Sequence, residues 1–383
     1  MIAADKFKGS LTAAEVAARV AAGLAAGGFT GKAVAVPVAD GGDGTVAAAL
    51  SAGFRRAELK VRGPAGEAVT AAYALRGDTA VIEAAQACGL TLLPAGRLAP
   101  LTATSYGVGE LILAARQAGA HRIVLGVGGV ATTDGGAGLL QALGARLADA
   151  AGQPLPPGGG ALTQLAALDL SGLADLGQAE FLLASDVDNA LLGPAGAAAV
   201  YGPQKGASAA DVALLEAGLR RWADIAEAAR GSGPARGSGP ARGTGPARDA
   251  PGAGAAGGIG FAALLFLGAR MRPGIELLLE LGSFSSWLEG ARLVVTGEGS
   301  LDAQTLHGKA PAGVARLTAA LDPQVPVVAV AGRCTLTSEQ LHAAGIARGY
   351  ALTDLEPDQE RCLTEAGPLL ERLAARVAAD WLR

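Results

Sequence analysis

The segment VTGEGSLDAQTLHGKAP, residues 295–311, places two carboxylates and one lysine around a glycine-rich turn. Glu298 and Asp302 follow a short apolar run that is typical of a buried strand. Lys309 precedes Pro311, a residue that favours the first turn of a helix. This composition suits the binding of phosphate, or of a metal ion that carries phosphate. Such chemistry needs further charged groups, which the rest of the chain must supply.

Five glycine-rich turns stand at predicted strand-to-helix junctions. In parallel sheets, ligands bind at the carboxyl ends of strands, where the first N–H groups of helices point toward anions. One such turn is weak evidence, because glycine often serves only to tighten a connection. Several turns that combine glycine with Asp or Lys favour a shared binding site. The turns are DKFKGS (5–10), ADGGDGT (39–45), GVGGVATTDGGAG (126–138), GAGAAGGIG (252–260) and TGEGSLDAQTLHGKAP (296–311).

The acidic candidates all lie in predicted turns after strands. An Asp in a turn often does no more than cap the backbone, so each acid alone is as compatible with a structural role as with a functional one. We expect at least two of them to share one site. They are Asp40, Asp43, Asp134, Asp186, Asp188, Glu298 and Asp302. No histidine has a convincing Ser or Cys partner in the sequence, so a hydrolase triad is unsupported.

Lysine is rare in this chain, with six lysines among 31 lysines and arginines. A chain that uses arginine by default keeps lysine where a compact, flexible ammonium group matters. Lys8, Lys205 and Lys309 each adjoin a glycine, and we expect them to be functional rather than ordinary surface residues. For Lys6 the two interpretations are equally supported.

Two glycine runs match the dinucleotide fingerprint in part. GVGGVA, residues 126–131, follows a predicted strand, but the helix that must begin within the glycines is delayed by TTDGG. NAD binding is therefore the minority interpretation. GAGAAG, residues 252–257, leads into an apolar helix without a strand before it. It indicates either a backbone phosphate cradle or close packing.

Composition excludes several protein classes. A chain of 383 residues exceeds the usual size of one core, which favours two domains. No stretch has the length and apolar character of a membrane span, and no apolar signal core follows Asp5 and Lys6. The three cysteines form neither a disulfide framework nor a zinc pattern. A net charge of −4 argues against nucleic-acid binding. Taken together, these features lead us to expect a cytoplasmic globular protein.

Apolar strands alternate with helices along most of the chain. This alternation predicts a mostly parallel sheet covered on both faces. Two runs joined by Gly-Pro-Ala-Gly predict a hairpin, and the repeat RGSGPARGSGPARGTGPAR predicts a disordered linker over residues 230–250. The expected strands lie near residues 2–4, 32–38, 57–63, 69–75, 121–129, 180–187, 292–297 and 325–332. The expected helices lie near residues 12–26, 136–148, 211–229 and 338–344, with others from residue 311 and at the C-terminal end.

Six motifs in order resemble the signatures of the bacterial glycerate kinase family (type I, glycerate 2-kinase). They are DKFKGSL, VADGGDGT, ATTDGGAG, SDVDN, GAGAAGGIGFA and VVTGEGSLDAQTLHGKAP. The resemblance runs from residue 2 nearly to the C-terminal end. It departs from the family in the short segment before Asp5 and in the Gly-Ser-Pro-Ala-Arg repeat.

This resemblance implies a fold of two α/β domains with the active site in the cleft between them. One is a Rossmann-like, doubly wound, mostly parallel domain, which we assign to residues 1–78 and 286–383. The other is an inserted α/β domain over residues 79–285. The implied reaction is ATP-dependent phosphorylation of D-glycerate to 2-phospho-D-glycerate, with 3-phosphoglycerate the less favoured product. The resemblance implies ATP and Mg²⁺ as co-substrate and cofactor, and it allows a homodimer.

The matching motifs suggest residue roles, which we state as hypotheses. Asp186 is our choice for the base that accepts the hydroxyl proton, with Asp43 next and Lys8 as a further catalytic residue. Glu298 and Asp302 are assigned to Mg²⁺ or its waters. The residues expected to bind substrate are Lys6, Ser10, Asp40, Asp134 and Lys205. The residues expected to bind ATP phosphates are Gly252, Gly254, Gly257, Gly258, Gly308 and Lys309.

Two other functions stay open at this point. One is an NAD-dependent oxidoreductase that uses residues 126–131. The other is a non-enzymatic sensor that binds a ligand in the same cleft.

Overall fold

The computed structural model describes every residue except 37, 39–41, 43, 232–245, 308 and 383. Its contacts divide the chain into two compact units. Unit 1 comprises residues 1–40, 47–53 and 273–383, and unit 2 comprises residues 41–46 and 54–272. The predicted site residues Asp40, Asp43 and Gly308, and most of the predicted linker, lie outside the described residues.

Unit 1 is built on a four-stranded parallel sheet. Its strands are β1 (Ile2–Ala4), β10 (Val294–Leu301), β11 (Val327–Cys334) and β12 (Arg348–Ala351), in that order across the sheet. Ile2 also forms a parallel bridge with Ala35 on the outer side of β1. The strands are apolar along most of their length, as expected for a parallel sheet buried on both faces.

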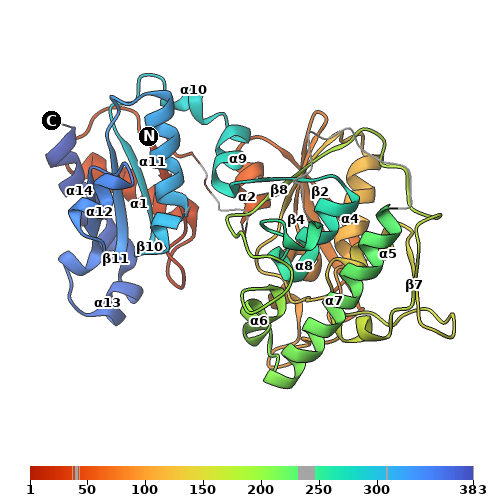
Figure 1. Cartoon of the computed structure of the whole chain (residues 1–383). Helices are drawn as coiled ribbons and strands as arrows, with labels where there is room; N and C mark the ends of the chain where they lie inside the picture. The colour runs from red at the N-terminus through yellow and green to blue at the C-terminus, as the bar shows by residue number, and fades with distance from the viewer. Residues whose placement is uncertain (37, 39–41, 43, 232–245, 308, 383) are drawn as a thin grey trace. The chain divides into compact units, whose positions relative to one another are not determined.

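Helices cover both faces of this sheet (Figure 1). Helices α1 (Ala13–Ala26) and α14 (Ala366–Trp381) pack together on one face, against the side of β10 that carries Val295. Helices α9 (Gly274–Leu281) and α11 (Ala310–Leu321) pack on the other. The remaining helices of unit 1 are α10 (Phe284–Leu288), α12 (Ser338–Ala343) and α13 (Gln359–Thr364), and most of α2 (Thr45–Ser51) belongs to it as well.

The strand order reverses between β1 and β10. From β1 the chain runs through α1 to Ala35 on one side, whereas β10, β11 and β12 follow one another on the other side. Such a switch point leaves a crevice outside the carboxyl ends of the two central strands, which is where open α/β sheets bind ligands.

Unit 2 contains a mixed six-stranded sheet. Its order is β2 (Arg55–Arg62), β3 (Ala68–Arg76), β4 (Thr79–Glu83), β5 (Arg122–Gly126), β8 (Glu180–Ala184) and β9 (Arg270–Arg272). The first three strands are antiparallel, and β4, β5, β8 and β9 are parallel. A short antiparallel pair, β6 (Arg146–Ala148) and β7 (Ala167–Asp169), lies apart from this sheet.

Aromatic packing marks the core of unit 2. The main helices are α4 (Tyr106–Gln117), α5 (Ala137–Ala142), α7 (Ala209–Gly231) and α8 (Ala255–Phe266), with short α3 (Ala85–Cys88) and α6 (Ala197–Tyr201). Trp222 of α7 is fully buried; it meets Phe261 edge-on and stacks on Phe266 of α8. The indole N–H donates to Gly135 O at 2.9 Å, so its polar end is satisfied as well.

The predicted α/β class with mostly parallel strands is confirmed, but some boundaries differ. The hairpin of β2 and β3 belongs to unit 2, whereas the sequence-based division placed residues 1–78 in one domain. Residues 273–285 belong to unit 1. The helix expected over residues 136–148 was wrong at its end, because α5 stops at Ala142 and residues 146–148 form β6.

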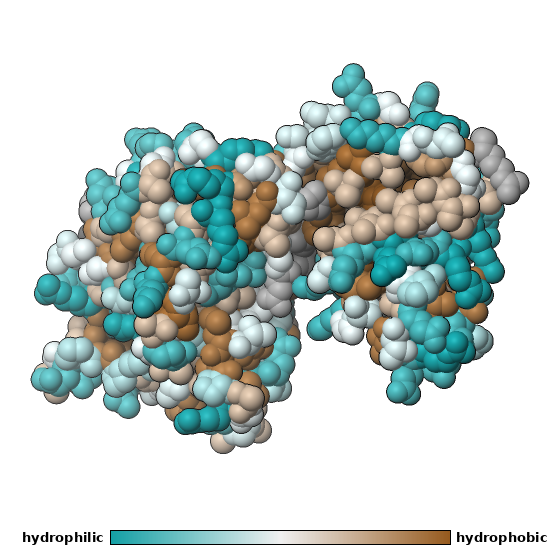
Figure 2. Space-filling model, turned by 180° about the vertical axis from the view of Figure 1, so that it is seen from behind, coloured by the Kyte–Doolittle hydropathy of each residue, from teal (hydrophilic) through white to brown (hydrophobic). Residues whose placement is uncertain are grey.

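None of the described helices is both long and apolar enough to cross a membrane. On the face drawn in Figure 2, hydrophobic residues form separate patches among hydrophilic ones.

Candidate functional site

A cluster of charges lies at the carboxyl end of β10 in unit 1. Lys309 is the N-cap of α11, with Pro311 in the first turn as the sequence predicted. Its Nζ lies 3.5 Å from Glu298 Oε2 and 3.9 Å from Asp302 Oδ1. The lysine side chain is 34 % exposed, so its ammonium group remains accessible to an anion. The three residues singled out in this turn are therefore neighbours in space.

Hydroxyl groups fix the two carboxylates of this cluster. Thr305 Oγ1 donates to Glu298 Oε1 at 2.5 Å, and the N–H of Asp302 donates to Thr305 Oγ1 at 3.0 Å. Ser300 Oγ donates to Asp302 Oδ2 at 3.2 Å. Burial raises the pKa of Glu298, while Thr305 and Lys309 act in the opposite direction. The turn thus presents one nearly buried acid, one half-buried acid and one cation.

The loop after β1 carries the other predicted cations of unit 1. Phe7 and Leu11 form a bridge that closes the loop, and Ser10 Oγ donates to Phe7 O at 3.2 Å. Lys8 and Ser10 line a hollow in unit 1. The N–H of Lys6 donates to Asp5 Oδ1 at 2.7 Å. The closed loop brings Lys8 and Ser10 to one wall of the hollow.

In unit 2, Asp134 is buried and accepts hydrogen bonds from four groups. Ser105 donates from its N–H at 2.8 Å and from its Oγ at 2.9 Å, both to Oδ2. The N–H groups of Gly136 and Gly138 donate at 3.0 and 3.2 Å. Asp134 is 1 % exposed, and its carboxylate links the backbone at Ser105 to the backbone at Gly136 and Gly138. Its assignment to substrate stays a prediction.

Lys205 is also buried, at 3 % exposure. Its Nζ donates to Thr132 O at 2.5 Å and to Thr133 Oγ1 at 3.4 Å. Burial lowers the pKa of Lys205 to about 8, against the raising influence of Cys88 and Asp134. Lys205 therefore contacts the two residues that directly precede Asp134.

Close packing explains the glycine run that leads into α8. Residues 256–258 have positive φ, and a Cβ on Gly257 would lie 2.1 Å from Thr132 O. A Cβ on Gly258 would lie 2.7 Å from Gly135 Cα, and one on Gly254 would lie 2.3 Å from Ala190 O. Only glycine fits at these positions. Gly252 is buried against Met271, and the assignment of the run to ATP phosphates stays a prediction.

Asp186 is exposed and follows β8 by two residues. The neighbouring Asn189 is fixed by Tyr201, whose hydroxyl donates to Asn189 Oδ1 at 2.6 Å. Asn189 Nδ2 in turn donates to Ala195 O at 2.8 Å. The SDVDN motif therefore combines an exposed acid at the carboxyl end of a parallel strand with an anchored asparagine. This geometry is compatible with a base that meets a substrate hydroxyl.

Sequence analysis missed Glu83, the last residue of β4. It is 4 % exposed, and the N–H of Val46 donates to its Oε2 at 3.0 Å. In register it lies opposite Gly126 at the carboxyl end of β5. An acid that ends the apolar run TAVIE was the available signal.

The geometry does not support a dinucleotide fingerprint. Strand β5 ends at Gly126 and α5 begins at Ala137, so no helix starts within GVGGVA. As for metals, the described part of the chain contains no group of three or more His, Cys, Asp or Glu residues placed to hold an ion.

Comparison with known proteins gives consistent results. The model of the glycerate kinase family matches residues 1–382. The chain is 44 % identical to the glycerate kinase of Bacillus subtilis (strain 168), over 99 % of this chain and 97 % of that protein. It is 43 % identical to the glycerate 2-kinase of Escherichia coli (strain K12), over 90 % and 88 %. A crystal structure from Salmonella typhimurium LT2, described as "putative glycerate kinase 2", superposes with a TM-score of 0.81 at 39 % identity, over 99 % and 96 %.

Proposed function

Because the chain belongs to the glycerate kinase family, we propose that it transfers the γ-phosphoryl group of ATP to the 2-hydroxyl of D-glycerate. The observation that supports this most directly is the Lys309 cluster, in which a cation at a helix N-terminus lies between two carboxylates. Phosphoryl transfer depends mainly on positioning and on charge neutralisation, and this cluster supplies both.

In the proposed reaction, Lys309 binds phosphate oxygens at the first turn of α11. The N–H groups of that turn and the ammonium group attract the same anion. Glu298 and Asp302 would hold Mg²⁺ or its waters. Mg²⁺ typically takes one or two protein carboxylates and fills its other positions with water and phosphate oxygens, and two acids within reach of one lysine fit this pattern. The metal would supply neutralisation of charge on the phosphates.

Asp186 is the proposed general base. It accepts the proton of the 2-hydroxyl while that oxygen attacks the γ-phosphorus, and the bond to the bridging oxygen of ADP breaks. Asp43 is the second candidate for this role. We assign binding of the glycerate carboxylate and hydroxyls to Lys6, Ser10, Asp40, Asp134 and Lys205, and we keep Lys8 as a further catalytic residue that offsets charge on the phosphates.

Incubation of the protein with D-glycerate, ATP and Mg²⁺ tests the proposal. The expected products are ADP and 2-phospho-D-glycerate, and ³¹P NMR distinguishes this product from 3-phosphoglycerate. Binding of D-glycerate without formation of a phosphate ester would instead indicate a sensor. Stabilisation against heat by NADH but not by ATP would indicate an oxidoreductase. Because ATP is the co-substrate, we place the reaction in the cytoplasm; assembly as a homodimer stays a prediction.

A further inference from the structure

A hollow of about 170 Å³ opens beside the switch point of the unit 1 sheet. Its walls come from the loop after β1, the ends of β10 and β11, the turn after β12, and α13. All of these segments belong to unit 1, so the hollow is complete within one compact body. The lining residues are Phe7, Lys8, Ser10, Gly299, Gly332, Arg333, Leu352, Thr353, Gln359, Cys362 and Leu363.

Two glycines in neighbouring strands form the floor of the hollow. Gly299 of β10 and Gly332 of β11 both lie in its lining. A Cβ on Gly332 would lie 2.7 Å from Gly299 O, and one on Gly299 would lie 3.3 Å from the backbone N of Lys8. Larger residues would therefore press on the backbone and fill the floor.

The chemistry of the walls fits a flat ring that carries an anion. Leu363 supplies exposed apolar surface, the nearly buried Phe7 and Leu352 lie behind it in the lining, and Ser10, Thr353 and Gln359 supply hydrogen-bonding groups. Lys8 and Arg333 add two positive charges, and the lining residues include no carboxylate. D-glycerate has hydroxyls on a short chain and no apolar face, so it does not match the apolar walls. A purine nucleotide matches this lining, because its ring suits the apolar residues and its phosphates suit the positive charges.

A chain of contacts joins the hollow to the Lys309 cluster. Arg333 Nε donates to Ser300 Oγ at 3.0 Å, and Ser300 Oγ donates to Asp302 Oδ2 at 3.2 Å. Asp302 Oδ1 lies 3.9 Å from Lys309 Nζ. These contacts place Arg333 and Lys309 on the same edge of the sheet.

We infer that this hollow binds the purine base of ATP and ADP, with Lys8 and Arg333 contacting the phosphates. The inference deepens the proposed function and rests on it for the choice of nucleotide. It places nucleotide recognition in unit 1, at the carboxyl ends of β1, β10 and β11.

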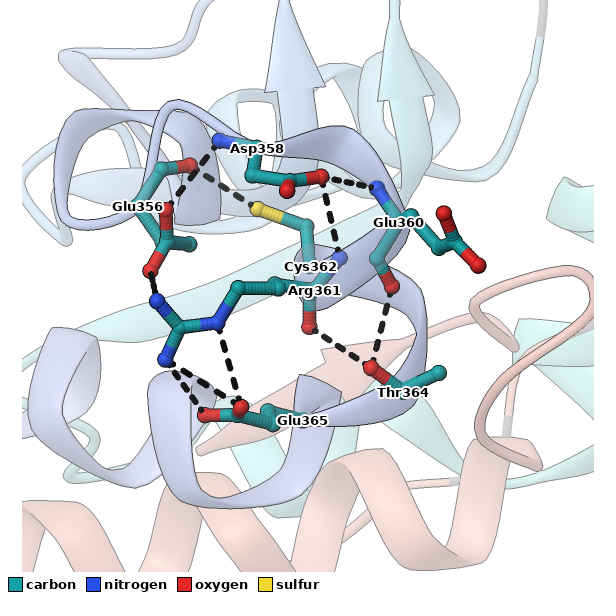
Figure 3. Close-up of polar contacts among 7 residues, drawn as sticks. All are labelled: Glu356, Asp358, Glu360, Arg361, Cys362, Thr364 and Glu365. Carbon is teal, nitrogen blue, oxygen red and sulfur yellow. Dashed lines mark hydrogen bonds and ion pairs between the residues drawn. The ribbon is translucent and has the colours of Figure 1, made fainter.

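Helix α13 forms a fixed wall for this ligand. Asp358 caps the helix by accepting from the N–H groups of Glu360 and Arg361 (Figure 3). The guanidinium group of Arg361 forms ion pairs with both Glu356 and Glu365, as Figure 3 shows. Cys362 faces the hollow and donates its thiol to the carbonyl oxygen of Glu356 at 3.1 Å. The neighbouring Leu363 is 53 % exposed, so substitution there leaves the core of the unit intact.

The test compares Leu363→Glu with Thr364→Glu, and titration calorimetry measures ADP binding to the full chain. Both variants add one carboxylate to α13, but only residue 363 lines the hollow. We expect Leu363→Glu to raise the dissociation constant for ADP about tenfold, because the new charge repels the ligand, whereas Thr364→Glu changes it less than about twofold. Arg333→Gln removes an attractive charge, and we expect it to weaken ADP binding as well.

The outcomes separate this inference from the proposed function. If wild-type protein forms phosphoglycerate but Leu363→Glu and Thr364→Glu bind ADP equally well, the hollow is not the nucleotide site and the kinase proposal stands. If Leu363→Glu weakens D-glycerate and leaves ADP unchanged, the hollow binds the acid, and the inference is overturned. If no phosphate ester forms but Leu363→Glu selectively weakens ADP, the kinase proposal fails while the nucleotide site stands.

Discussion

Lys309 Nζ lies 3.5 Å from Glu298 Oε2, and this pair joins the N-terminus of α11 to the end of β10. With Asp302 also within 3.9 Å of the ammonium group, two acids surround one base. A phosphate that joins this cluster brings further negative charge. Glu298 and Asp302 would hold a divalent cation, or its waters, that offsets this negative charge.

Replacing Lys309 by Met should affect catalysis far more than folding. The ammonium group is partly exposed, and the nearly buried Glu298 keeps its hydrogen bond from Thr305, so loss of the ion pair should cost only about 1 kcal/mol. The proposed role of Lys309 in neutralising the transferred group predicts a fall in kcat of about a hundredfold or more. Steady-state kinetics and a thermal melt would measure the two effects. Arg316→Met is the matched control, because Arg316 lies on α11 like Lys309 and forms an ion pair with Glu276 of α9. Equal turnover in both variants would remove Lys309 from the mechanism.

Asp186→Asn should abolish most turnover while the protein still binds D-glycerate. The amide keeps the size of the side chain but cannot accept the hydroxyl proton, and general bases contribute about 10²–10⁴-fold to rate. Steady-state kinetics measures kcat and calorimetry measures binding. Asp175→Asn, at an exposed turn acid of the same unit, serves as the control. Near-normal kcat in Asp186→Asn would transfer the role to another acid.

Asp134→Ala should destabilise unit 2 strongly. The substitution leaves the buried donors of Ser105, Gly136 and Gly138 without their acceptor, and each buried donor left unpaired costs about 1–3 kcal/mol. Urea unfolding should therefore show a loss of several kcal/mol. Asp149→Ala is the control, because Asp149 also accepts from two backbone N–H groups but is more accessible to water. If both variants lose the same free energy of unfolding, burial of the Asp134 hydrogen bonds adds nothing to stability.

The lowered pKa of Lys205 predicts that the free energy of unfolding rises with pH. Its pKa is lowered from 10.5 to about 8 in the folded protein, so between these values the unfolded chain binds more protons. The free energy of unfolding should therefore increase from about pH 8 upwards, by at most about 3 kcal/mol from this group. Urea unfolding of wild type and Lys205→Met at several pH values isolates the contribution.

A second buried group opposes this trend. Burial raises the pKa of the Cys88 thiol, so the folded protein keeps a proton that the unfolded chain loses, and stability falls as pH rises. Cys88 is present in both wild type and Lys205→Met, so the difference between their profiles reports on Lys205 and on its interaction with Cys88. Lys32→Met, at an exposed lysine, should show the same pH profile as wild type. A parallel profile for Lys205→Met would contradict the lowered pKa.

Local signals in the sequence predicted much of the fold. The capping box of Thr12 and Glu15 begins α1 as expected, and the alternating runs around Gly-Pro-Ala-Gly form the antiparallel hairpin of β2 and β3. In contrast, the short strand β4 was not predicted, although it lies at the centre of its sheet. Its five residues carry little periodicity, and only tertiary contacts define it.

The part of the candidate site whose charged residues are close together in the sequence could be predicted. Glu298, Asp302 and Lys309 lie within one turn, so their types and spacing sufficed. The packing role of Gly257 depends on Thr132, which is far away in the sequence. The burial of Lys205 likewise depends on distant partners, so adjacency to a glycine did not reveal it.

The pairing of β1 with β10 has a consequence for biosynthesis. Ile2 is made before its partner Val295, which follows almost three hundred residues later in the chain. Residues 54–272 can collapse around their own core during translation, before β10 is available to pair with β1. Pairing of β1 with β10 therefore has to wait until Val295 has been synthesised.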